Sequence, residues 1–202
     1  MTQSMPEQNI KLMRLMKQAI DENLLEAGFH PLLQTRFPDR KSYLLNGNLK
    51  TASGQMIPYK SLRKLAAVTD MGAALDRWMV NTALQTLKRM HLEQPEANII
   101  VPQSISSLHN PEYPRWLDRQ RTRQDVSTRG LIISFRLSQI AKNLKLANEC
   151  IAALHRLDIN TMIDSFTTHP AALKILKAMG CRYMSAAPAL LKEKDDTIKR
   201  II

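Results

Sequence analysis

The stretch LIISFRLSQIAKNLKLANECIAALHRLDINTMIDSF, residues 131–166, decides the fold. Residues 131–138 and 160–166, at its two ends, are short and mostly apolar runs, which are typical of strands buried on both faces of a sheet. The segment between them repeats apolar residues at helical spacing, with one face formed by Ile140, Leu144, Ala147, Ile151 and Leu154. A strand, a helix and a second strand in this order predict two parallel strands joined by a crossover helix.

The same alternation continues outward from this stretch. Before it, the sequence predicts a strand at 98–104 and a helix at 111–123. After it, the sequence predicts a helix at 170–179, a strand at 181–190 and a final helix at 192–202. Near-continuous apolar strands that alternate with helices indicate an α/β fold with a parallel sheet covered by helices.

The first 92 residues are less regular. They predict a helix at 9–24, an extended segment at 27–35, a strand and loop within 41–58, and a long helical stretch over 59–92. This last stretch is expected to break near Thr69–Gly72, where Asp70 would cap the second helix. The whole chain then has about six strands, and no linker or shift in composition divides it. We therefore expect a single domain over residues 1–202.

Composition excludes several classes of protein. The chain has 202 residues, 44% of them hydrophobic, and no run approaches the ~18 apolar residues of a membrane helix. The N-terminus has no signal-peptide pattern, so a cytoplasmic location is expected, and Cys150 and Cys181 are expected to be free thiols. The net charge of +11 favours phosphates or acidic partners. Nucleic acid is disfavoured because the arginine-rich segment 115–129 lacks interleaved aromatic residues.

Ligand sites of parallel α/β folds lie at the carboxyl ends of the strands. At these ends the sequence offers mostly hydroxyl, amide and alanine side chains, and Asp164 is the one carboxylate among them. We expect Asp164 to form a local hydrogen bond or to cap the turn before the next helix, and ligand contact is the alternative. The five histidines show no pairing at metal-ligand spacing, so no metal site and no cofactor are expected.

The order of these segments resembles the EAL family, the cyclic di-GMP phosphodiesterases built on a TIM-like barrel. The segment LAAVTDMGAALDRWMVNTAL, residues 65–84, is similar to the family pattern, and Asp76, Arg77 and Trp78 match its "DRW". The strands at 98–104, 131–138 and 160–166 resemble the family's motif-bearing strands in the same order. The resemblance implies a TIM-barrel-like EAL fold that is incomplete, with about six of its eight strands.

Carried over position by position, the resemblance implies that the catalytic positions are replaced. The signature glutamate falls on Leu44, the metal-binding asparagine on Pro102, and two further glutamates on Ser134 and Leu137. The acidic pair of the family falls on Asp164 and Ser165, and its lysine on Ser185. Hydrolysis by such a site needs two divalent cations held by hard oxygen ligands. The resemblance therefore implies a degenerate member that is not an enzyme.

Two functions are compatible with this interpretation. Active hydrolysis of cyclic di-GMP is a third possibility and the least favoured. The favoured one is a protein-interaction module in cyclic di-GMP-related regulation, with its partner surface on Lys60, Arg63 and Lys64. The alternative is a FimX-like receptor that binds cyclic di-GMP without hydrolysing it, for which the candidate residues are Asn48, Lys64, Ser104, Asp164 and Ser165. Self-association is also expected, because an incomplete parallel sheet leaves strand edges unpaired.

Overall fold

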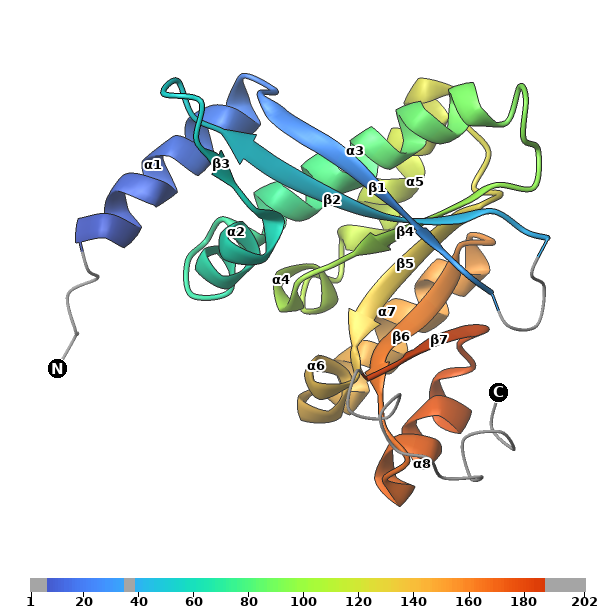
Figure 1. Cartoon of the computed structure of the whole chain (residues 1–202). Coiled ribbons are helices and arrows are strands. Elements are labelled where there is room, and N and C mark those ends of the chain that lie inside the picture. The colour runs from blue at the N-terminus through green and yellow to red at the C-terminus, as the bar shows by residue number, and fades with distance from the viewer. Residues whose placement is uncertain (1–6, 35–38, 188–202) are drawn as a thin grey trace, which may run out of the picture.

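The computed structural model describes residues 7–34 and 39–187, and its centre is one seven-stranded sheet that does not close into a barrel (Figure 1). The strands follow the order β1-β2-β4-β5-β6-β7, and β3 pairs with β2 beside this path. Their bounds are β1 Leu25–Leu32, β2 Ser42–Lys50, β3 Met56–Ile57, β4 Asn98–Pro102, β5 Leu131–Arg136, β6 Asn160–Phe166 and β7 Tyr183–Ala186. An α/β fold with an open, barrel-like sheet is thus confirmed.

Eight helices accompany the sheet in the described part of the chain. They are α1 Glu7–Asp21, α2 Tyr59–Ala66, α3 Gly72–Met90, α4 Ile105–Leu108, α5 Tyr113–Gln124, α6 Leu137–Lys142, α7 Leu144–Arg156 and α8 Pro170–Met179. None of the helices in residues 7–34 and 39–187 is long and apolar enough to span a bilayer.

Strand direction differs from the expectation at the N-terminal end of the sheet. Strands β2, β4, β5, β6 and β7 are parallel, as the crossover pattern predicts. Strand β1 pairs antiparallel with β2 along its whole length, from Leu25 opposite Leu49 to Leu32 opposite Ser42. Strand β3 is also antiparallel to β2. A short connection between β1 and β2 permits only an antiparallel pair, because a parallel pair requires a crossover of a dozen or more residues.

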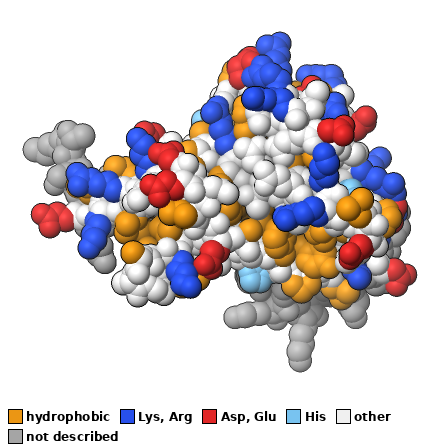
Figure 2. Space-filling view, turned by 90° about the horizontal axis from the view of Figure 1, so that it is seen from above, with side chains coloured by type: hydrophobic (Ala, Val, Ile, Leu, Met, Phe, Trp, Pro, Cys, Tyr) orange, Lys and Arg blue, Asp and Glu red, His pale blue; other side chains and the backbone are white. Residues whose placement is uncertain are grey.

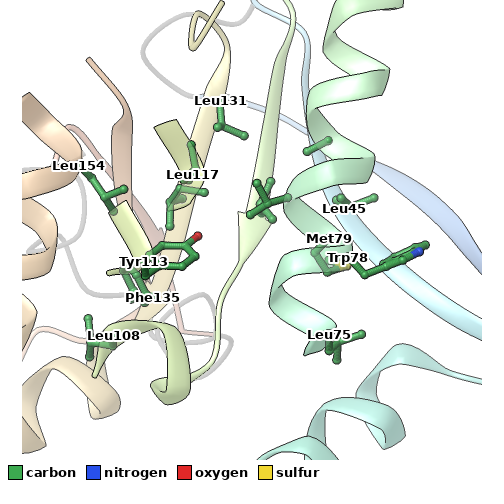
Figure 3. Close-up of a cluster of buried hydrophobic side chains, with 14 of the residues drawn as sticks. Leu45, Leu75, Trp78, Met79, Leu108, Tyr113, Leu117, Leu131, Phe135 and Leu154 are labelled. Carbon is green, nitrogen blue, oxygen red and sulfur yellow. The ribbon is translucent and has the colours of Figure 1, made fainter. Parts of the chain in front are cut away.

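The main hydrophobic core fills the space between the sheet and its helices. Figure 3 shows Trp78 and Met79 of α3 near Leu45 of β2, with Tyr113 and Leu117 of α5 near β5. The Trp78 ring packs directly on the backbone of Gly47, where a Cβ atom would lie 2.5 Å from the ring. The "DRW" tryptophan thereby fixes α3 against β2.

Three local expectations are wrong. The long helical stretch breaks where predicted, but the N-cap of α3 is Met71 and no side chain caps it, so Asp70 does not have that role. The single helix expected over 140–157 is two helices, separated at Asn143, which leaves the helical region with φ −143°. The sheet has seven strands rather than six because of β3. The final helix expected at 192–202 lies outside the described residues.

The two cysteines are free, and Cys150 is buried in the core. Charged side chains are distributed rather than gathered. From above, Lys and Arg side chains are scattered over the surface with Asp and Glu among them (Figure 2). Several arginines of the segment 115–129 have acidic neighbours: Arg115 pairs with Glu112, Arg121 with Asp118 and Arg129 with Glu96. On the face that Figure 2 shows, basic and acidic side chains are thus interspersed.

Candidate functional site

The carboxyl ends of the parallel strands form the wall of one large cleft. Its volume is about 620 Å³, within the range of roughly 300–1,000 Å³ that small-molecule sites occupy. All five parallel strands line it: β2 with Leu44, β4 with Pro102, β5 with Ser134, β6 with Asp164 and β7 with Ser185, among others. We call this site the cleft.

Helix α2 supplies the cationic side of the cleft. Lys60, Arg63 and Lys64 follow one another at helical spacing and all line the cleft. The opposite face of α2 carries Leu62 and Leu65, which are buried in the core. This amphipathic pattern fixes the rotation of α2, so that its basic face is held against the strand ends.

Arg136 supplies a fourth cation from the end of β5. It lies opposite Asp164 in the register between β5 and β6, and its Nε is 3.6 Å from Asp164 Oδ2. The Ser185 hydroxyl donates to Asp164 Oδ1 at 2.7 Å. The local hydrogen bond expected of Asp164 is thus confirmed. The other role considered for Asp164, capping the turn before α8, belongs to His169, which accepts from the Ala171 amide.

Tyr59 lies at the start of α2 and lines the cleft. Burial raises the pKa of its phenol to about 12, while the positive charges of Arg63 and Arg136 act against that rise. The phenol therefore stays neutral at physiological pH, and both arginines are near enough to influence it. The backbone N–H of Tyr59 donates to Asn48 Oδ1 at 3.0 Å. The side-chain oxygen of Asn48 therefore holds the first turn of α2.

Asp76 lies behind the cleft wall, on α3, with 2% of its surface exposed. The Ser104 amide donates to both carboxylate oxygens, at 3.0 and 2.9 Å. The hydroxyls of Ser104 and Ser107 each donate to Oδ2 at 2.6 Å. Burial raises the pKa of Asp76 to about 6, and these hydrogen bonds and the Arg63 charge hold it below the value that burial alone would give.

The structure brings together most of the residues selected from the sequence. Asn48, Lys60, Arg63, Lys64, Ser104 and Asp164 all line the cleft. Ser165 does not. It lines a smaller hollow of about 320 Å³ beside α6 and α8, and its backbone has a φ of 60°.

Sequence reasoning missed Tyr59, Gln139 and Arg136 as lining residues, and it gave Asp76 no polar role. Arg136 directly follows the apolar run of β5, so its position at a strand end was a usable signal. A single acid within the apolar sequence around Asp76 was a second signal, because buried carboxylates need hydrogen-bond donors. Tyr59 and Gln139 carried no comparable signal, since helix faces converge only in the folded chain.

The positions that the resemblance assigns to the family's site also converge on the cleft. Leu44, Pro102, Ser134 and Ser185 line it together with Asp164, whereas Leu137 lines the smaller hollow beside Ser165. Asp164 is the one carboxylate of the cleft wall. Within residues 7–34 and 39–187, no three His, Cys, Asp or Glu side chains gather closely enough to hold a metal ion.

The family model of the EAL domain matches residues 13–200 of the chain. The chain belongs to the EAL domain family. An uncharacterized 76.5 kDa protein of Thiocystis violacea, encoded in the phbC 3′ region, is 20% identical over 190 residues. That alignment covers 94% of this chain but 28% of the relative, so the chain spans less than a third of the curated protein it matches.

Solved EAL domains share the fold. A FimX EAL domain superposes with a TM-score of 0.84 at 18% identity, covering 94% of this chain and 77% of that one. The FimX EAL domain of Pseudomonas aeruginosa bound to c-di-GMP gives 0.80 at 18% identity, with the same coverage. That of Xanthomonas citri in complex with c-diGMP gives 0.81 at 17% identity, covering 91% of this chain and 71% of that one. At these identities the likeness establishes the fold.

Proposed function

We propose that this EAL domain is a non-catalytic receptor whose cleft binds a cyclic dinucleotide, cyclic di-GMP, without a divalent metal. The observation that carries the proposal is the charge of the cleft wall. Lys60, Arg63, Lys64 and Arg136 line it, against the single carboxylate of Asp164. Cyclic di-GMP carries two phosphodiester charges, and the FimX EAL domains of the same fold include complexes with it.

The arrangement of the cations suits a dianion that bridges the cleft. Three of them lie on α2 and the fourth lies at the end of β5. Arg136 is half exposed and its 3.6 Å approach to Asp164 is looser than a direct hydrogen bond, so its guanidinium can turn toward a phosphate at small cost. Arginine binds phosphate through two parallel N–H donors, which adds geometric selectivity to charge.

The residues of the cleft do not fit the pair of divalent cations that EAL phosphodiesterases use. Leu44 and Pro102 offer no oxygen ligand from their side chains, and the serine hydroxyls at Ser134 and Ser185 are neutral. Asp164 already faces Arg136 and accepts from Ser185. Divalent cations of this kind require several hard oxygen ligands with negative charge. The four cations around the cleft would repel them as well.

Calorimetric titration of the chain with cyclic di-GMP tests the proposal. Saturable binding with a Kd in the micromolar range, about −8 kcal/mol, is expected. The affinity should be the same with magnesium or EDTA, and it should fall as salt screens the phosphate contacts. Lys64→Glu should abolish binding, whereas Lys145→Glu, which makes the same charge change on the exposed side of α7, should leave it unchanged. An absence of binding heat at several temperatures would contradict the proposal.

A second candidate function has one observation in its favour. Several polar groups of the cleft are already paired within the chain: Asn48 Oδ1 with the Tyr59 amide, Asp164 with Arg136 and Ser185, and Ser104 with Asp76. A protein-interaction module that has lost the nucleotide would have such a self-satisfied site, with its partner on the basic face of α2. In that case the titration is silent, and Lys64→Glu, at an exposed position of the same face, weakens binding of an acidic protein partner without changing the melting temperature.

A further inference from the structure

A buried carboxylate behind the cleft holds one segment of the cleft wall. Ser104, Ile105 and Ser106, at the turn from β4 into α4, line the cleft. The turn is attached to α3 through Asp76, which accepts from the Ser104 amide and from the hydroxyls of Ser104 and Ser107. All these bonds lie in a region from which water is excluded, where a hydrogen bond to a charged group is strongest.

A close packing contact supports the same attachment from a second direction. Gly72, the first residue of α3, leaves no room for a side chain: an added Cβ would lie 2.6 Å from Ser106 Oγ and 3.0 Å from Ser104 Oγ. Helix α3 and the turn thus approach as closely as their atoms allow. A displacement of the turn relative to Asp76 would have to move the wall of the cleft.

The carboxylate also acts on the cationic side of the cleft. The charge of Arg63 is close enough to lower the pKa of Asp76, and Arg63 lines the cleft from α2. The other titratable groups that face Asp76 are Tyr59 on α2 and Tyr113 on α5, whose phenols have pKa values raised by burial and stay neutral. Asp76 therefore holds the wall at Ser104 by hydrogen bonds and interacts with Arg63 through charge alone.

We infer that Asp76 is a positioning residue, which sets the width of the cleft by holding the β4–α4 turn in place. The inference rests on the proposed function where it concerns ligand affinity, but the attachment of the turn is independent of any ligand. The ionised carboxylate accepts all of the surrounding N–H and O–H donors. Protonation of the carboxyl group removes the negative charge that strengthens these bonds, and it requires one serine hydroxyl to change from donor to acceptor, so the attachment is weakened.

Protonation gives the inference a distinctive signature. Because burial raises the pKa of Asp76 to about 6, the carboxyl group is ionised at pH 7.5 and mostly protonated at pH 5. The turn should be held tightly at the higher pH and loosened at the lower one. A residue that only filled space would show no such dependence.

Hydrogen exchange of the Ser104 and Ser106 amides tests the attachment without a ligand. In the full chain at pH 7.5, Asp76→Asn should speed exchange of the Ser104 amide by at least ~10-fold. Ser107→Ala, which removes one hydroxyl bond, should speed it by a smaller factor and serves as the test variant if Asp76→Asn does not fold. Asp118→Asn, a half-exposed acid on α5, is the control for the loss of one charge and should change nothing.

Titration with cyclic di-GMP between pH 5 and 8 tests the consequence for the cleft. The affinity of the unmodified chain should fall as pH drops through about 6, whereas Asp76→Asn should bind more weakly and without a step at this pH. If the unmodified chain binds no nucleotide, the proposed function fails while the exchange measurement still decides the role of Asp76. Equal Ser104 protection in all variants, or the same pH step in Asp76→Asn, would overturn the inference.

Discussion

Asp164 is the one carboxylate among the side chains that line the cleft. It occupies the end of β6 among the strand ends that line the cleft. Its partners are a guanidinium and a hydroxyl, from Arg136 and Ser185. The nearby guanidinium already offers this carboxylate a positive partner, so a cation would have to compete with Arg136 for it. The proposed binding without a metal ion is thus consistent with the partners of this side chain.

This leads to a prediction for activity. The purified chain should not linearise cyclic di-GMP in magnesium or manganese above a control without protein, because Leu44, Pro102 and Ser134 supply no charge to hold a metal-activated water. Product formation is followed by chromatography. Turnover that disappears in Asp164→Ala, but persists in Asp118→Asn, would show that a working site exists and that the proposed function is wrong.

Asp76 and Arg136 show where sequence reasoning stops at this scale. The resemblance placed Asp76 in a scaffold motif, and packing of the adjacent Trp78 on Gly47 supports that role. Its hydrogen bonds to Ser104 and Ser107 join residues 28 and 31 positions apart. The spacing of apolar residues along the sequence does not predict that such distant residues meet. The strand-end rule did locate Ser104 and Asp164, because the rule depends only on strand order.

At the scale of elements, the α/β alternation from β4 to β7 was predictable because each element carries its own period. The break between α6 and α7 was not, since apolar spacing continues through Asn143 while the backbone leaves the helical region there. The antiparallel direction of β1 could not be predicted from the apolar pattern either. A strand period specifies which side chains share a face, and direction depends on the connection.

The end of α5 carries an element-scale prediction. Asp125 terminates this helix in the left-handed region, at φ 52° and ψ 56°. Asp125→Ala should lower the free energy of unfolding by about 1 kcal/mol, because both residues carry a Cβ but aspartate enters the left-handed region more readily than alanine does. Asp125→Gly should stay within ~0.5 kcal/mol of the unmodified chain, since glycine accepts this conformation. Urea denaturation measures both.

The exposed interior of the same helix provides the control. Arg119→Ala changes an exposed side chain of α5 at a position with ordinary helical backbone. The free energy of unfolding should stay the same or rise slightly, because alanine has the higher helix propensity. If Asp125→Ala and Asp125→Gly were equally destabilising, the left-handed conformation would not be the cause, and loss of the aspartate charge would explain the result better.

At the scale of the whole molecule, the sheet has two ends. Strand β1 and strand β7 stand at the ends of the order β1-β2-β4-β5-β6-β7, so each has a single strand neighbour within the described residues. Leu24 and Leu33, on either side of β1, are 52% and 81% exposed. A strand edge flanked by exposed leucines is a surface on which another chain can pair.

We therefore predict that the chain associates with itself through the β1 edge, and that the sedimentation coefficient rises with protein concentration. Leu33→Lys should shift this association to higher concentration, because a charge beside the edge strand opposes pairing and removes apolar contact. Leu92→Lys is the matched control: this leucine is 84% exposed at the end of α3, away from β1. A sedimentation coefficient that is constant over the whole range, or an equal effect of the two lysines, would place the interface elsewhere or exclude it.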